Sequence, residues 1–184
     1  MLAGRSSSDR AGVDHPPQAD SLPHLQGGKN RIMRLGLISD THGLMRPSAL
    51  AALRSSELIL HAGDVGSPAV LEALRQIAPV VAVRGNIDTA EWAAYLPVTT
   101  AVEAGAVRIY MLHDLHKLDI DPAAAGFHIV LSGHSHKKNE SVRSGVLYLN
   151  PGSAGPRRFR MPVTLALLDT SLKPLRAKFI ELDA

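Results

Sequence analysis

The sequence predicts an α/β fold in which a largely parallel sheet forms one layer of a single domain. Three short apolar segments, at residues 34–39, 57–62 and 79–83, are expected to be buried strands, and predicted helices at 47–54 and 68–76 separate them. Strands that alternate with helices are typical of βαβ units, in which the strands run parallel. Each strand is followed by polar residues beside a glycine, so we expect those residues to meet at one ligand-binding edge of the sheet.

Local features support these elements. The strand at 34–39 is an apolar run with almost no charge. The helix at 47–54 begins at Pro47, where the missing N–H group of proline costs least. The segment at 79–83 (PVVAV) is rich in β-branched valine, which favours a strand.

The second half of the chain follows a different pattern. Segments 99–103 and 107–111 flank Ala104-Gly105-Ala106, which is a hairpin signal. Residues 121–126 (DPAAAG) predict a short helix, and 129–132 predicts another buried strand. The last third is rich in predicted strands, at 141–143, 146–149, 163–169 and 177–182.

Composition excludes several classes of protein. The 184 residues fit one domain, predicted at 33–184, behind a disordered N-terminal tail at 1–32 that is rich in serine, glycine and proline. The chain has no cysteine, so disulfides and thiolate metal sites are excluded. A net charge of +3 and 4% aromatic residues give no strong signal for nucleic acid.

No apolar run reaches the roughly 18 residues that span a membrane. Residues 1–30 also lack the apolar segment of roughly 7–15 residues that a secretion signal needs, so we expect a cytoplasmic protein. The oligomeric state is left open by the sequence.

Side chains that commonly bind metals follow five of the predicted strands. They are Asp40 and His42, then Asp64, Asn86 and His113, and finally His134 and His136. This number of ligand-type residues fits two metal ions better than one, provided that one aspartate is shared. Imidazole together with carboxylate and amide oxygens favours Mn, Fe or Zn over a pure Mg or Ca site. Two metal ions about 3.5–4 Å apart are the usual device for attack on a phosphorus centre.

The order of these motifs resembles that of the calcineurin-like metallophosphoesterase superfamily. The motifs are Asp40-x-His42, Gly63-Asp64, Gly85-Asn86-x-Asp88, His113 and Gly133-His134-x-His136. The short chain, and Asn150-Pro151-Gly152-Ser153 after the last histidine, look like the small YfcE-type phosphodiesterase branch. The resemblance covers residues 34–182 and implies a four-layer α/β/β/α sandwich of two packed mixed sheets.

The resemblance also implies a site. One metal ion would be bound by Asp40, His42, Asp64 and His136, and the other by Asp64, Asn86, His113 and His134, with Asp64 bridging. Asp88 would orient neighbouring groups, and the residues implied in catalysis are Asp64, Asn86, Asp88 and His113. The implied activity is hydrolysis of a small phosphoester, a phosphodiester first, by attack of metal-bound hydroxide. The resemblance implies two divalent metal ions. Manganese is the first choice of metal, with nickel, iron or zinc as alternatives.

The sequence departs from the family pattern at two positions. Many members have a histidine that is taken as the leaving-group acid, where this chain has Ile87, although the small branch often lacks that histidine too. The family's His-Gly-His around the fourth motif is His113-Asp114 here. The alternative is therefore a non-catalytic metal-binding scaffold or interaction protein, the use that a retromer subunit makes of this fold.

Several other polar residues have a functional and a structural interpretation. His61 is expected to be packed or hydrogen-bonded rather than a metal ligand, and His116 is expected to be a loop residue that could neighbour substrate. Arg84 and the pair Arg157-Arg158 could bind a phosphate or could simply be solvated.

Overall fold

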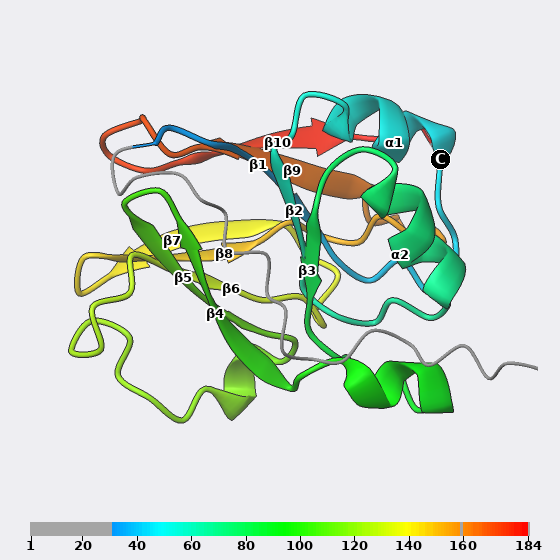
Figure 1. The fold of residues 1–184 in the computed structure, drawn as a ribbon, viewed down its shortest axis with the longest axis horizontal. Coiled ribbons are helices and arrows are strands. Elements are labelled where there is room, and N and C mark those ends of the chain that lie inside the picture. The colour runs from blue at the N-terminus through cyan, green and yellow to red at the C-terminus, as the bar shows by residue number, and fades with distance from the viewer. Residues whose placement is uncertain (1–30, 159, 184) are drawn as a thin grey trace, which may run out of the picture.

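The computed structural model describes residues 31–158 and 160–183, so the tail predicted at 1–32 lies outside the described residues apart from its last two. Two five-stranded sheets pack face to face as separate layers (Figure 1). The first sheet contains, in spatial order, β10 (Ala177–Glu181), β9 (Thr164–Asp169), β1 (Arg34–Ile38), β2 (Leu58–His61) and β3 (Val80–Ala82). The second contains β4 (Thr99–Ala104), β5 (Val107–Leu112), β6 (Ile129–Leu131), β8 (Val146–Asn150) and β7 (Asn139–Arg143).

Both sheets are mixed. In the first sheet β1, β2 and β3 run parallel, as the βαβ pattern predicts, and β9 and β10 are added antiparallel. In the second sheet β5, β6 and β8 run parallel, and β4 and β7 form antiparallel edges. The predicted fold class is therefore confirmed.

The main core lies between the two sheets. Leu35 and Leu37 of β1 face it, whereas Ile38 faces the other side of the first sheet, because side chains alternate along a strand. The helices α1 (Pro47–Leu53) and α2 (Pro68–Arg75) cover that other side, where Leu53 and Leu74 are fully buried (Figure 1).

The outer face of the second sheet has a thinner cover. It is packed by the short 3-10 helix η2 (Leu115–Lys117) and the loop after it. The helix predicted at 121–126 is wrong, because the segment forms turns. The Asp121 carboxylate accepts hydrogen bonds from the N–H groups of Ala123 and Ala124, and Gly126, at φ 74°, ends the turn before a helix can extend. A second 3-10 helix, η1 (Glu91–Tyr95), was not predicted.

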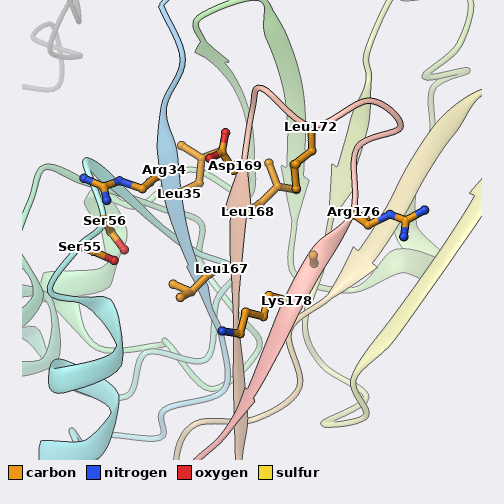
Figure 2. Close-up of a pocket in the computed structure, with 11 residues that line it drawn as sticks. Arg34, Leu35, Ser55, Ser56, Leu167, Leu168, Asp169, Leu172, Arg176 and Lys178 are labelled. Atoms are coloured by element: carbon orange, nitrogen blue, oxygen red, sulfur yellow. The ribbon is translucent and has the colours of Figure 1, made fainter.

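The first sheet carries a hollow of about 290 Å³ where the helices leave its outer face uncovered. Arg34, Asp169 and Lys178 line this hollow, together with Leu167 (Figure 2). It lies beside the first residue of β1, whereas the predicted metal ligands follow the last residue of that strand, so the hollow is separate from the candidate site. In the described part of the chain, no helix combines the length and apolar character needed to cross a membrane.

Candidate metal centre

The structure brings all seven predicted ligands together where strands from both sheets end. Asp40 and His42 follow β1, Asp64 follows β2, Asn86 comes after β3, His113 follows β5, and His134 and His136 follow β6. An unbroken chain of contacts of 3.0–3.9 Å between side-chain donor atoms links them. The structure therefore places these strand ends side by side, although they belong to two packed sheets and not to the edge of one sheet.

The first group of donor atoms comes from Asp40, His42 and His136. His136 Nε2 lies 3.3 Å from Asp40 Oδ1 and 3.2 Å from His42 Nε2. Asp64 Oδ2 faces the same group, 3.9 Å from His42 Nε2. Two imidazole nitrogens and two carboxylate oxygens thus converge, which is a donor set that suits a transition-metal ion.

The second group comes from Asn86, His113 and His134, and again includes Asp64. Asn86 Oδ1 lies 3.2 Å from His113 Nε2 and 3.0 Å from His134 Nδ1, and Asp64 Oδ1 lies 3.3 Å from His113 Nε2. His113 Nδ1 donates a hydrogen bond to the carbonyl of Ala62 at 2.8 Å, which leaves the Nε2 lone pair for a metal ion. The two oxygens of Asp64 therefore face different groups.

A buried oxygen in the first group fits a bound cation. Asp40 Oδ1, which lies 3.3 Å from His136 Nε2, is buried and has no hydrogen-bond partner among the described residues. Burial raises the pKa of Asp40 to about 6 and lowers the pKa of His136 to about 4, so at neutral pH the pair is a carboxylate beside a neutral imidazole and not an ion pair. A buried carboxylate oxygen without a donor is costly unless a cation compensates it.

In the second group, hydrogen bonds outweigh burial in setting the pKa values of His113 and Asp64. Burial alone would lower the pKa of His113, but its hydrogen bonds to the Asp64 carboxylate and to the Ala62 carbonyl raise it overall. Burial would likewise raise the pKa of Asp64, but hydrogen bonds from His113 and from the N–H of Ile87 hold it below its usual value. Asp64 is therefore ionised at neutral pH.

These pKa shifts predict that metal affinity falls as the pH is lowered. Asp40 and His113 must each lose a proton before they can bind a metal ion, whereas the lowered pKa of His136 keeps that ligand neutral. Below about pH 6, the Mn²⁺ affinity of wild type should fall about tenfold per pH unit for each proton displaced. Calorimetric titrations with Mn²⁺ between about pH 8 and about pH 5 measure this. In Asp40→Asn, the Mn²⁺ affinity should fall less steeply below pH 6. A wild-type Mn²⁺ affinity that does not change with pH would contradict the assignment of Asp40 and His113 as metal ligands.

The ligand-bearing turns have an unusual backbone. Five of the predicted ligands have positive φ angles, namely Asp40 (53°), His42 (48°), Asp64 (53°), His134 (67°) and His136 (58°). A residue other than glycine in this region costs on the order of 1–3 kcal/mol. The fold therefore tolerates strain where the turns aim these side chains at one another.

Two substitutions of His134 separate the strained backbone from the side chain. His134 is exposed, so losing its imidazole should cost the metal-free protein little. Glycine adopts a positive φ freely and alanine does not, so metal-free His134→Gly should be more stable than His134→Ala by about 1 kcal/mol. Urea unfolding with a chelator measures the difference. Equal stability of the two variants would show that the backbone at this position is not strained.

Asp88 does not face the donor atoms but holds the turns that carry them. Its carboxylate is buried and accepts hydrogen bonds from the N–H groups of Val65 (3.1 Å), Gly66 (2.8 Å) and Gly85 (2.9 Å). Asp88 thereby ties the turn after Asp64 to the turn before Asn86, which is the orienting role that the family resemblance implies.

Substitution of Asp88 should weaken both folding and metal binding. Asp88→Ala leaves three buried or half-buried N–H groups unpaired, and we expect a loss of about 3 kcal/mol in the free energy of unfolding. Metal affinity should fall about 10- to 100-fold, because the ligand turns are no longer held. Asp88→Asn keeps one acceptor oxygen and should lose less of both. Chemical denaturation and metal titration should rank wild type above Asp88→Asn, and Asp88→Asn above Asp88→Ala. An Asp88→Ala variant as stable as wild type would contradict the orienting role of Asp88.

A buried hydrogen-bonded chain that the sequence did not reveal joins the first two turns. The Gly63 N–H donates to His61 Nδ1 at 3.2 Å, so Nε2 carries the proton and donates to Thr41 Oγ1 at 2.9 Å. The Thr41 hydroxyl in turn donates to the Val65 carbonyl at 3.0 Å. Burial lowers the pKa of His61 to about 4, so the ring is neutral. The expectation that His61 is a hydrogen-bonded structural residue is confirmed.

The Asn150-Pro151-Gly152-Ser153 segment fixes two further turns. Asn150 Nδ2 donates to the Gly133 carbonyl at 2.6 Å, next to His134. Ser153 Oγ donates to the Asp40 carbonyl at 2.9 Å. The sequence marked this segment only by resemblance, and the structure shows its physical role.

The remaining candidates surround the centre. Ile87 is 41% exposed and so lies at the surface of the site. Asp114 accepts a hydrogen bond from the His116 N–H at 3.0 Å and so caps η2. Arg84 lines a hollow with Asn86, His113 and His134, and His116 lines a second hollow that also contains His134.

A two-sheet α/β sandwich with a paired cluster of metal-type ligands at its strand ends has the architecture of a metallophosphoesterase. The family model described as the calcineurin-like phosphoesterase superfamily domain matches residues 33–173, and the chain belongs to this superfamily. Divalent metal ions are the cofactors of that family, and the donor set described above fits them.

Relatives agree with this assignment. The chain is 34% identical to a probable metallophosphoesterase of Methanothermobacter thermautotrophicus, over 83% of this chain and 90% of the relative. It is 26% identical to a phosphodiesterase of Methanocaldococcus jannaschii, over 81% of this chain and all of that protein.

Solved structures share the fold. A novel archaeal phosphodiesterase superposes with a TM-score of 0.69 at 24% identity, covering 82% of this chain and all of that one. Vacuolar protein sorting 29 of Cryptosporidium parvum superposes with a TM-score of 0.66 at 20% identity, covering 83% of this chain and 99% of that one.

Proposed function

We propose that this protein is a dinuclear metal-dependent phosphoesterase that hydrolyses a phosphodiester. The observation that carries the proposal is the position of Asp64, whose two carboxylate oxygens face two separate groups of donor atoms. A carboxylate in this position would bridge two ions. The relative and the structural neighbour that are called phosphodiesterases support the choice of a diester.

The ligand-type residues form two groups, one for each proposed ion. Asp40, His42 and His136 would hold one ion, and Asn86, His113 and His134 the other, with Asp64 shared. When bound, two such ions lower the pKa of a water molecule and neutralise charge that develops on phosphoryl oxygens. The Ala62 carbonyl fixes the tautomer of His113, and Asp88 fixes the turns on either side of the bridging carboxylate. Among divalent metals we propose manganese first, with nickel, iron or zinc as alternatives, because the donor atoms are nitrogen and oxygen without sulfur.

The surroundings of His134 favour a small diester as substrate. Two hollows, of about 360 Å³ and about 390 Å³, both reach this residue. Val98, Thr99 and Leu112 contribute to the first, and Leu115 and Tyr148 to the second. A diester has two substituents on phosphorus, and each hollow is large enough to hold a small organic group.

The proposal is tested by turnover of bis(4-nitrophenyl) phosphate across Mn²⁺, Ni²⁺, Zn²⁺ and Mg²⁺. Release of nitrophenolate should require metal, stop with a chelator, and return when Mn²⁺ is restored. 4-Nitrophenyl phosphate, a monoester, should be the poorer substrate. No turnover of either ester with any metal would reject the enzyme proposal.

The second candidate is a non-catalytic metal-binding scaffold. It is favoured by one observation, that apolar Ile87 lies at the surface of the site where a proton donor would serve an enzyme. The vacuolar protein sorting 29 structures show only that the fold is shared. A protein that binds metal but lacks turnover would support the scaffold.

A further inference from the structure

Arg158, in the loop between β8 and β9, contacts a predicted metal ligand. Its Nη2 lies 3.3 Å from His42 Nε2. A guanidinium group has no acceptor, so Arg158 donates to the lone pair of the ring nitrogen.

The same lone pair is the one with which His42 would bind a metal ion. One lone pair cannot accept from Arg158 and bind a metal ion at once. A divalent cation also repels a guanidinium group held at such a short distance. Metal binding by the Asp40, His42 and His136 group therefore requires the Arg158 side chain to leave His42.

Hydrogen bonds hold the backbone at Gly155, three residues before Arg158, against the site, so that a displaced guanidinium group remains within reach of it. The N–H of Gly155 donates to the Asp40 carbonyl at 3.1 Å, and Arg46 donates to the Gly155 carbonyl through Nε (3.3 Å) and Nη2 (3.2 Å). Among the residues that the structure describes, no carboxylate lies within 4.0 Å of Arg158. A guanidinium group released from His42 therefore has no carboxylate partner among these residues and would require an anion.

The rim of the site is strongly basic. The hollows that border it contain these charged residues: Arg84, Lys117, Lys137, Lys138, Arg157 and Arg158, against Asp114 and Asp119. The chain as a whole is nearly balanced, with 20 basic and 17 acidic residues. Positive charge is therefore concentrated where an anionic ligand would enter.

Resting on the phosphoesterase function proposed above, we propose that Arg158 is a substrate-binding residue that exchanges partners. It donates to His42 in the structure described here, and it donates to a phosphoryl oxygen of the substrate when His42 binds a metal ion. Guanidinium groups bind phosphoryl oxygens through short charge-assisted hydrogen bonds. The exchange also makes metal and phosphoryl binding cooperative, because an anion offsets the repulsion between Arg158 and the metal ion, and such coupling is reciprocal.

The test uses phenylphosphonate, a phosphoryl anion that cannot be hydrolysed, titrated calorimetrically into the Mn²⁺-loaded full chain. Arg158→Gln should weaken phenylphosphonate binding by about tenfold to a hundredfold. Arg157→Gln is the matched control, because it removes the same charge from the neighbouring residue, and it should cause a much smaller loss. Without phenylphosphonate, Arg158→Gln should bind Mn²⁺ at least as tightly as wild type.

Three results would overturn the assignment. Equal losses in the two variants would indicate a general charge effect. Unchanged phenylphosphonate binding in Arg158→Gln would show that Arg158 does not bind the anion. Weaker Mn²⁺ binding by Arg158→Gln in the absence of anion would make Arg158 a residue that positions His42. Turnover has no part in this titration, so phenylphosphonate binding through Arg158 in a protein that hydrolyses nothing would reject the phosphoesterase proposal alone.

Discussion

Asp64→Ala should abolish metal-dependent turnover of bis(4-nitrophenyl) phosphate, lowering kcat/KM by about three orders of magnitude or more. The reason is that Asp64 faces both groups of donor atoms, through Oδ1 toward His113 and Oδ2 toward His42, so that its loss would remove a ligand from both of the proposed ions. Each ion in such a pair is worth several kcal/mol of transition-state stabilisation. The measurement is steady-state release of nitrophenolate at saturating Mn²⁺.

Asp119→Ala is the matched control for this prediction. Asp119 is exposed and lines a hollow beside His113, but it does not belong to the donor cluster, so its removal should leave turnover close to that of wild type. An Asp64→Ala variant that is folded and retains turnover would contradict the bridging role of Asp64.

The second large effect that we expect is a strong dependence of the hydrolysis rate on the leaving group, and it follows from the apolar side chain of Ile87. Nitrophenolate is a stable anion near neutral pH and needs no acid, whereas an alkoxide does, and general-acid help is worth about 10²- to 10⁴-fold in rate. Ile87 cannot donate a proton, so wild type should favour aryl diesters steeply over alkyl diesters. Ile87→His should narrow this gap and change the aryl rate little, provided that the imidazole reaches the leaving oxygen.

A plot of rate against leaving-group pKa for both proteins, with the same metal, measures this effect. Wild type should give a steep negative slope, and Ile87→His a shallower one. Ile87→Val is the control, because it keeps the position apolar and should keep the steep slope. A flat plot for wild type would mean that another residue donates the proton. His116 would then be the first suspect, because it lines a hollow that reaches His134.

Much of the fold could be predicted from the sequence, because hydrophobic patterns reflect burial directly. The parallel arrangement of β1, β2 and β3 followed from apolar segments separated by helices. The helix expected at 121–126 was wrong for a local reason: the Asp121 side chain caps a first turn as at a helix N-terminus, but Gly126, at φ 74°, ends the segment after that turn. The η1 segment lacks a helical apolar repeat and depends on its tertiary setting.

The candidate site could be predicted as far as residue identity, because each ligand-type residue follows a strand. The positive φ angles of residues such as Asp64 could not be predicted, since hydrogen bonds between turns impose them. The chain from His61 through Thr41 to Val65 depends on contacts between separate strand ends. The contact of Arg158 with His42 joins residues 116 positions apart, which no local pattern reports. Metal binding itself stays a prediction.

The count of bound metal ions tests the central claim most directly. Elemental analysis of the Mn²⁺-loaded protein, after removal of free metal, should find about two ions per chain in wild type and close to none in Asp64→Ala. Asp40→Ala and His134→Ala, each of which the proposal assigns to one ion, should mainly weaken one site and each retain about one ion. A single tight ion in wild type that Asp64→Ala binds equally well would contradict the dinuclear centre.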